Sequence, residues 1–179
     1  MISEKEPLAL ESRKKVYSAI ERAPGLHFRE LQRRTKLAVG ALQYHLEVLE
    51  KAHLVKRTKK GKFVRYYSIR KPVKDEGEEI MSLLRQEVVR KIIIFLLSRK
   101  RAPANSIIAR AVELSASTCT FHLKKLEEQG LVERRKSKKK TLIYLKEPNR
   151  IANLLSVYKK SFLDELVDNF VEVWDELSE

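Results

Sequence analysis

The chain has 179 residues, 43% hydrophobic and 35% charged, which is typical of a globular protein and not of a disordered one. Lys and Arg number 38 and Asp and Glu 24, so the formal net charge of +14 favours an anionic partner, nucleic acid first and an anionic membrane surface second. One cysteine excludes a disulfide framework and a site of several thiolates. The longest apolar run, residues 92–97, is too short for a membrane span, and the N-terminus lacks the apolar core of a signal peptide, so we expect a soluble, cytoplasmic protein.

The charge changes sign along the chain. Residues 1–72 carry 18 basic and 7 acidic side chains, and residues 73–148 carry 17 and 10. Residues 149–179 carry 3 basic and 7 acidic side chains. The first two segments are therefore expected to meet the anionic partner, and the acidic last segment to have another role.

An internal repeat divides the basic part of the chain. Residues 11–68 align without a gap with residues 88–145, at an offset of 77, and 15 of the 58 pairs are identical. The apolar positions agree more fully still. Two copies of one unit are the simplest account, because a solenoid normally needs three or more.

Each copy has the pattern of three helices followed by two strands. The first helix begins near Pro7 and ends at the breaker sequence 23–25. A short helix, a turn and a third helix follow, and then two strands around a turn. Their ranges are 28–35, 36–38, 39–52, 54–57, 58–62 and 63–69.

The second copy repeats this order after a polar linker at 72–77. Asn105 is a candidate cap for its short helix, and Ser115 stands in a good N-cap position for its third. The expected helices are 78–98, 106–112 and 116–129, with strands at 131–135 and 141–145.

Three helices followed by a β-hairpin form the winged-helix arrangement. Residues 35–38 (TKLA) and 44–55 (YHLEVLEKAHLV) resemble the recognition-helix and wing signature of bacterial and archaeal winged-helix regulators of the ArsR and MarR type. Residues 114–118 (LSAST) and 121–132 (FHLKKLEEQGLV) match it better still. Over residues 11–145 the chain is similar to archaeal tandem winged-helix transcriptional regulators. The resemblance implies an α+β, mostly helical fold with domains at 1–72 and 73–148 and a long C-terminal helix at 149–179.

In such domains the third helix enters the major groove of DNA, so its first residues and outer face are candidates for base contact. In the first copy these residues are Val39, Gly40, Ala41, Gln43 and Tyr44. In the second copy they are Ala116, Ser117, Thr118, Thr120 and Phe121. Gln43 has the chemistry to read adenine, and the two threonines can hydrogen-bond or touch a thymine methyl group. Because Val39, Gly40 and Ala41 offer no side-chain hydrogen bond, the first copy is open to methyl and shape reading or to backbone binding.

Two basic hairpins suit contacts with phosphates or with the minor groove. Residues 56–71 hold eight Lys or Arg and no acid, and six of the seven residues at 134–140 are basic. The alternative for each is a solvated charge run. The candidate backbone contacts, with those of the first copy's short helix, are Arg29, Arg33, Arg34, Lys36, Lys59, Lys60, Lys62, Arg65, Arg135, Lys136, Lys138, Lys139 and Lys140.

Three other features receive structural interpretations. His45 and His122, at equivalent repeat positions, are expected to pack beside the third helix and to hydrogen-bond locally, and Cys119 to act as a buried small hydrophobe. No metal-binding spacing, cofactor motif or catalytic constellation is present in the sequence, so we expect no metal, no cofactor and no enzyme activity.

The acidic tail is expected to form one long amphipathic helix after Pro148. Its apolar residues recur at spacings of three and four, a stripe that must be covered. The alternatives are packing over the two domains and dimerisation, which the resemblance favours because ArsR-like proteins tend to dimerise through terminal helices. The candidate contacts are Phe162, Leu166, Phe170 and Trp174.

The sequence thus predicts a transcriptional regulator that binds specific sites in double-stranded DNA as a homodimer, without membrane association. The sequence carries no pattern that identifies an effector, an operator or the sign of regulation. The alternatives are a sequence-independent architectural or replication-linked DNA-binding protein and a winged-helix protein–protein adaptor. The positive charge and the basic hairpins count against the adaptor.

Overall fold

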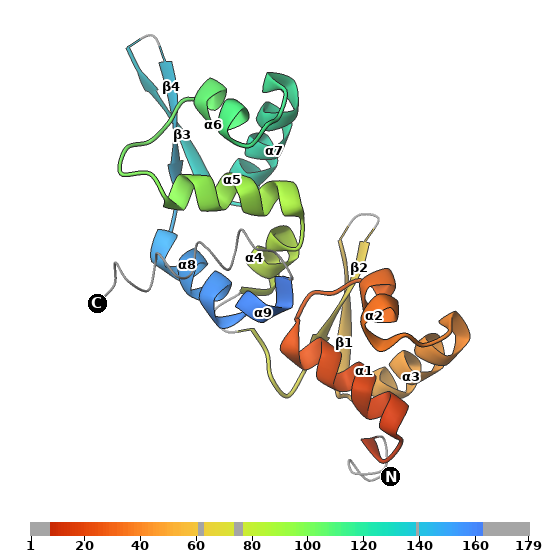
Figure 1. Ribbon diagram of the computed structural model, residues 1–179. Helices are drawn as coiled ribbons and strands as arrows, with labels where there is room; N and C mark the ends of the chain where they lie inside the picture. Colours follow the sequence, from red (N-terminus) through yellow and green to blue (C-terminus); the bar gives the residue numbers. More distant parts are fainter. Residues whose placement is uncertain (1–7, 61–62, 74–76, 139, 163–179) are drawn as a thin grey trace. The chain divides into compact units, whose positions relative to one another are not determined.

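The computed structural model (Figure 1) describes residues 8–60, 63–73, 77–138 and 140–162. Its contacts divide the chain into two compact units, Met1–Arg85 and Gln86–Glu179. The first unit contains α1 (Glu11–Arg22), α2 (Phe28–Thr35), α3 (Val39–Lys51), β1 (Val55–Lys60), β2 (Phe63–Ser68) and α4 (Gly77–Leu84). The second contains α5 (Glu87–Leu97), α6 (Asn105–Ala111), α7 (Ala116–Glu128), β3 (Val132–Ser137), β4 (Lys140–Leu145), α8 (Pro148–Val157) and α9 (Lys159–Phe162). Both the mostly helical α+β class and the tandem winged-helix arrangement are confirmed.

The chain between α1 and α2 turns where the sequence predicts a break. Gly25 has φ +81, and a Cβ there would lie 3.2 Å from the Tyr67 hydroxyl oxygen, so both conformation and space require glycine. α2 then begins with a capping box. The backbone N–H of Glu30 donates to His27 Nδ1, and the backbone N–H of His27 donates to the Glu30 carboxylate, which satisfies two donors at the helix start.

In each unit three helices are followed by an antiparallel hairpin. β1 and β2 pair from Val55 with Ser68 to Lys60 with Phe63, and β3 and β4 from Val132 with Leu145 to Ser137 with Lys140. A bridge from Leu26 to Tyr66 adds a third extended segment in the first unit, and one from Ala104 to Leu142 does so in the second. The third helix of each unit contacts the first strand of its hairpin, α3 with β1 and α7 with β3, as in a winged helix.

Equivalent positions of the two repeats form the two cores. Leu123 and Leu126 of α7 are buried as Leu46 and Leu49 of α3 are. Other matched positions are fully buried in both units, namely Val16 and Ile93, Leu31 and Ile108, and Leu42 and Cys119. The two units therefore bury equivalent positions of the repeat in their cores.

The helix expected at 78–98 is wrong, because α4 ends at Leu84 and α5 begins at Glu87. The side chain of Arg85 donates from Nε and Nη2 to the Pro24 carbonyl oxygen, 3.1 and 3.0 Å away, and Gln86 is extended. α4 packs with the first unit, where the Tyr67 hydroxyl donates to the Glu78 carbonyl oxygen at 3.0 Å. The division by contacts therefore falls between Arg85 and Gln86, and the domain bounds expected from the sequence, 1–72, 73–148 and 149–179, stay a prediction.

The single long helix expected after Pro148 is not confirmed. α8 ends at Val157, Tyr158 leaves helical geometry at φ −104 and ψ 15, and α9 has 4 residues. The apolar side of α8 is already used within the chain, because Ile151, Ala152 and Leu155 are fully buried. Leu166, Phe170 and Trp174 lie outside the described residues.

Candidate nucleic-acid interface

The outer face of α3 consists of the residues that the sequence singles out. Leu42, His45, Leu46 and Leu49 are buried on the inner side. The opposite side exposes Val39, Gly40, Ala41, Gln43 and Tyr44, with Val39 55% and Tyr44 56% exposed. Both are large apolar side chains that face away from their own core.

Among the five predicted base-contact residues of α3, the last two, Gln43 and Tyr44, carry the hydrogen-bonding side chains. The Gln43 amide donates to the Glu47 carboxylate one turn further on, at 3.4 Å. The guanidinium of Arg13, from α1, lies 5.9 Å from the centre of the Tyr44 ring. Side-chain hydrogen bonding on the predicted base-contact residues of α3 is therefore limited to Gln43 and the Tyr44 hydroxyl.

The equivalent face of α7 is polar. Ala116, Ser117, Thr118, Thr120 and Phe121 are all exposed, Phe121 at 65%. Ser115 is the N-cap, as predicted: its hydroxyl oxygen accepts from the Thr118 backbone N–H at 3.1 Å. That oxygen also lies 3.0 Å from the Ser117 hydroxyl and 2.8 Å from the Thr118 hydroxyl. The first turn of α7 thus presents a linked group of three hydroxyls.

Asn105 has a different role from the helix cap predicted for it. The N-cap of α6 is Ala104, which makes no side-chain hydrogen bond. The Asn105 amide instead donates to the Thr120 hydroxyl at 2.7 Å, and that hydroxyl donates to the Ala116 carbonyl oxygen at 2.7 Å. Asn105 therefore orients a base-contact candidate from the neighbouring helix. The sequence offered no signal for this, because the two residues belong to different elements.

Basic side chains of α2 and of the residue that follows it are largely at the surface. Arg29, Arg33 and Lys36 are exposed, and Lys36 occupies a left-handed turn at φ 57. Arg34 is half-buried, and burial lowers the pKa of its guanidinium while the carboxylate of Glu30 opposes that effect. Three of the four predicted cations are thus presented to solvent.

Arg65 is a correction to the predicted wing contacts. It is 7% exposed, and its Nη1 donates to the Gly25 carbonyl oxygen at 2.7 Å. Burial lowers the pKa of this guanidinium. Arg65 therefore ties β2 to the turn after α1 and is not available to DNA. In the same wing Lys59 is exposed, Lys60 is the last residue of β1, and Lys62 lies outside the described residues.

The wing of the second unit keeps its predicted cations at the surface. Lys136, Lys138 and Lys140 are exposed, whereas Lys139 lies outside the described residues. Arg135 is exposed but engaged, with two nitrogens 2.9 and 3.0 Å from the Glu133 carboxylate. These hydrogen bonds raise the pKa of Arg135 and lower that of Glu133. The lysines are therefore the more accessible cations of this wing.

The two histidines belong to the third helix of their units, His45 to α3 and His122 to α7. Neither Nδ1 has a hydrogen-bond partner in the described part of the chain, so the predicted local hydrogen bond is not made by that atom. Burial lowers the pKa of both imidazoles, and the cations of Arg13 and Lys125 add to the effect at His45 and His122 respectively.

Cys119 packs as the predicted small hydrophobe. It is fully buried, and burial raises the pKa of its thiol. Among the described residues no three His, Cys, Asp or Glu side chains are grouped as a metal site would require. No helix in the described ranges is long and apolar enough to cross a membrane.

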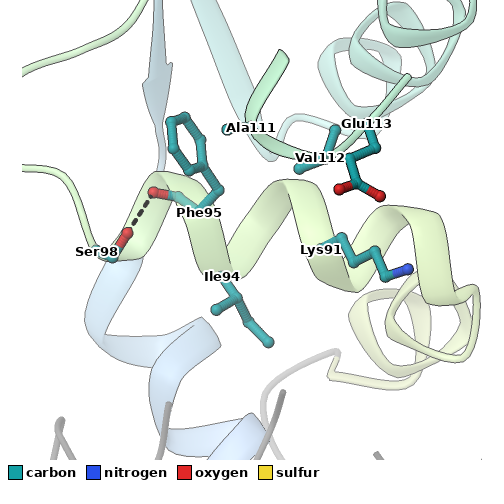
Figure 2. Close-up of a pocket in the computed structure, with 7 residues that line it drawn as sticks. All are labelled: Lys91, Ile94, Phe95, Ser98, Ala111, Val112 and Glu113. Atoms are coloured by element: carbon teal, nitrogen blue, oxygen red, sulfur yellow. Dashed lines mark hydrogen bonds between the residues drawn. The ribbon is translucent and has the colours of Figure 1, made fainter. Parts of the chain in front are cut away.

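A cavity of about 320 Å³ lies beside α5 in the second unit. Figure 2 shows Phe95 and Lys91 extending from α5 beside the turn that carries Val112 and Glu113. The Ser98 hydroxyl donates to the Phe95 carbonyl oxygen at 2.9 Å, and the Lys91 ammonium lies 2.7 Å from the Glu87 carboxylate. The serine and the lysine are thus already engaged within the helix.

Phe162, proposed from the sequence as a dimer or interdomain contact, is buried within the second unit. It is 7% exposed and lies under the guanidinium of Arg90, 5.4 Å from the ring centre. Deleting the chain from residue 151 would uncover this core, so a test of dimerisation has to act on the residues after Phe162.

Two domain families match the chain. Residues 10–76 match a family described as an N-terminal HTH domain, and residues 86–133 match a family described as winged helix-turn-helix DNA-binding. The first range contains α1 to β2, the helices and the hairpin of the first candidate interface. The second contains α5 to α7 but ends before most of the hairpin formed by β3 and β4.

A relative in Methanocaldococcus jannaschii, named as an uncharacterized HTH-type transcriptional regulator (MJ1398), is 31% identical over 148 residues. The match covers 82% of this chain and 36% of the relative, so the chain spans about a third of that protein's length. A crystal structure of the DIP2311 protein from Corynebacterium diphtheriae shares 14% identity, over 75% of this chain and 26% of that one. Its TM-score of 0.29 is too low to indicate a shared overall fold.

Proposed function

We propose that the chain, whose two units match helix-turn-helix families and which is similar to an archaeal HTH-type transcriptional regulator, is itself a transcriptional regulator that binds specific sequences of double-stranded DNA. In this proposal α3 and α7 enter the major groove, and the two hairpins contact the phosphate backbone. Binding to promoter DNA would act by occlusion or by recruitment of other factors.

One observation carries the proposal. The same surface is built twice, with an exposed outer face on the third helix and lysines exposed on the following hairpin. In the described part of the first wing Lys56 forms an ion pair with Glu78, and in that of the second wing the ion pairs involve Arg134 and Arg135. Cations that the fold leaves in water beside an exposed helix face form the electrostatic footprint expected of a DNA-binding module.

Selection from random duplexes tests the proposal. The full chain is incubated with a pool of random double-stranded DNA at near-physiological salt, and the bound fraction is amplified and sequenced through several rounds. We expect an enriched motif with two parts, one for each recognition helix. A pool that binds without enrichment would contradict specific recognition and favour the sequence-independent architectural role.

That second role has one observation in its favour, because the first turn of α3 carries no hydrogen-bonding side chain at Val39, Gly40 or Ala41. The adaptor role is not favoured, since it gives no purpose to the exposed lysines of the wings. If DNA is not bound at all, both DNA-binding roles fail together.

We also propose that the chain forms a homodimer through residues 163–179. Leu166, Phe170 and Trp174 recur every four residues there, which suits one apolar face of a helix. The expected result of light scattering is a dimer for the full chain and a monomer for the full-length double variant Phe170→Ser and Trp174→Ser. A full chain that is already monomeric would contradict the proposal.

A further inference from the structure

The hydroxyl group of Thr120 is held by two hydrogen bonds, although Thr120 is exposed on the outer face of α7. The hydroxyl donates to the Ala116 carbonyl oxygen at 2.7 Å, and the Asn105 amide donates to the same hydroxyl oxygen at 2.7 Å. Asn105 is the first residue of α6. Two helices therefore fix the orientation of one exposed hydroxyl.

The directions of these two hydrogen bonds follow from the chemistry of the groups. A carbonyl oxygen can only accept, so the single hydroxyl proton of Thr120 lies towards Ala116. The Asn105 atom that faces Thr120 must then be the amide nitrogen, because an amide oxygen there would need a second hydroxyl proton. The hydroxyl oxygen accepts from Asn105 and keeps one lone pair for a partner outside the chain. Thr120 can therefore accept from an incoming group but cannot donate to it.

Packing does not account for an asparagine at position 105. The Asn105 Oδ1 atom is buried and has no hydrogen-bond partner within the described residues. A buried acceptor without a partner destabilises the folded state, and an apolar side chain would avoid that penalty. The equivalent residue of the first repeat is the apolar Phe28, which packs against the core of its unit. What Asn105 contributes is its hydrogen bond to Thr120.

A hydroxyl that can only accept is restricted in what it can bind on a DNA duplex. Phosphate oxygens are acceptors, and so are N7 and O6 of guanine, N7 of adenine and O4 of thymine, so none of them can hydrogen-bond to Thr120. The donors of the major groove are the exocyclic amino groups, N6 of adenine and N4 of cytosine. We propose that Thr120 reads the exocyclic amino group of an adenine or a cytosine, and that Asn105 is the positioning residue for this contact.

The proposal rests on the DNA-binding function proposed above and adds the chemistry of one base contact. It also gives that contact a means of rejecting the other bases. A guanine O6 or a thymine O4 opposite Thr120 would bring two acceptors together without a proton between them. Thr120 therefore favours adenine and cytosine over guanine and thymine at the base that it faces.

The hydroxyls in the first turn of α7 differ from Thr120, because they keep a proton. The Ser115 oxygen accepts from the Thr118 backbone N–H and lies 3.0 and 2.8 Å from the Ser117 and Thr118 hydroxyls. Three hydroxyl protons serve these two contacts between oxygens, so one proton remains for an outside acceptor. Ser117 or Thr118 can thus donate to a phosphate or a base, whereas Thr120 cannot.

Base analogues that lack the exocyclic amino group test the proposal. Duplexes of the motif selected by the full chain are synthesised with one adenine at a time replaced by purine, or one cytosine at a time by 2-pyrimidinone. Fluorescence anisotropy gives the affinity of the full chain for each duplex. We expect a loss of about fivefold at the base under Thr120, the value of one hydrogen bond. The series in which this loss occurs distinguishes adenine from cytosine.

Three variants assign the loss to its residue. Thr120→Val replaces the hydroxyl by a methyl group of similar size, so the loss at one position should disappear while losses at other positions stay. Thr118→Val is the matched control, because it removes an exposed hydroxyl from the same helix and should keep that loss. Asn105→Ala should reduce the loss at the same position and leave the affinity for the substituted duplex unchanged. A merely structural role of Asn105 would lower both affinities alike.

Thermal unfolding checks that Thr120→Val is folded, and its midpoint should match that of Thr118→Val because both side chains are exposed. If Thr120→Val keeps every loss that the unchanged chain shows, the inference is overturned while sequence-specific binding stays intact. An equal effect of Asn105→Ala on both duplexes would overturn the positioning role. Absence of any selected motif would overturn the proposed function as well.

Discussion

At the scale of single residues, Arg65 shows that a basic residue of the wing can have a structural role and be unavailable to a partner. It lies in a hairpin rich in Lys and Arg, yet it is buried and donates to the Gly25 carbonyl oxygen at 2.7 Å. Sequence could not distinguish it from its neighbours, because its partner is the turn between α1 and α2, distant in the chain. The charge pattern locates the wing, but it does not say which cations face solvent.

Replacing Arg65 should therefore destabilise the protein. In Arg65→Met the buried Gly25 carbonyl oxygen loses its donor, and the free energy of unfolding should fall by roughly 1–3 kcal/mol. Lys59→Met, an exposed cation on the paired strand, should leave stability unchanged. Urea denaturation measures both, and equal stabilities would count against the structural role.

His45 and His122 lead to a prediction about pH. Burial first and a nearby cation second lower both imidazole pKa values below the ordinary value of about 6.5. Just below the ordinary imidazole pKa the unfolded chain therefore binds more protons than the folded chain does. The contribution of the neutral imidazoles to the free energy of unfolding is fully present above the ordinary pKa and is lost as the pH falls below it.

The free energy of unfolding should accordingly decrease from pH 7.5 to pH 5.5, and less steeply in the double variant His45→Gln and His122→Gln. Urea denaturation at the two pH values measures the change, and NMR titration of the imidazoles measures its cause. Imidazole pKa values at or above the ordinary value would refute this explanation.

At the scale of elements, local signals predicted the helices with clear ends. α2 has the predicted bounds, because its capping box and the breaker before it lie in adjacent sequence. α7 begins after its predicted cap, Ser115. Both strands of each wing were also expected, although β1 and β3 extend further towards the hairpin tips than the turn residues suggested.

Two elements could not be predicted, because tertiary contacts decide them. The apolar pattern is continuous from α4 to α5, and the break follows from hydrogen bonds between Arg85 and the Pro24 carbonyl oxygen. The periodic stripe after Pro148 suggested one helix, but Tyr158 leaves helical geometry. Periodicity reports which residues are apolar, not whether the backbone between them is uninterrupted.

The wing of the second unit gives the prediction at this scale. Charge reversal in Lys138→Glu should weaken binding to all duplexes alike and reduce the slope of log affinity against log salt by about one, the value of one phosphate contact. Lys160→Glu, which changes the net charge equally from an exposed position in α9, is the control. If both variants bind as the unchanged chain does, the wing does not contact DNA.

At the scale of the whole molecule, the repeat was the strongest signal in the sequence. Matched core positions such as Leu42 and Cys119 are both fully buried, so the tandem could be predicted without structural information. The difference between the two candidate interfaces could be predicted from the sequence only in part. The hydrogen bond from Asn105 to Thr120 appears only in three dimensions. The likeness to the ArsR type in particular stays a prediction.

The most direct test of the central claim is the preference of the full chain for its selected duplex. Fluorescence anisotropy at near-physiological salt compares that duplex with a scrambled one of equal length and composition. A specific regulator should prefer the selected sequence by about a thousandfold or more. Equal affinities for the two duplexes would contradict the claim that these winged helices read sequence.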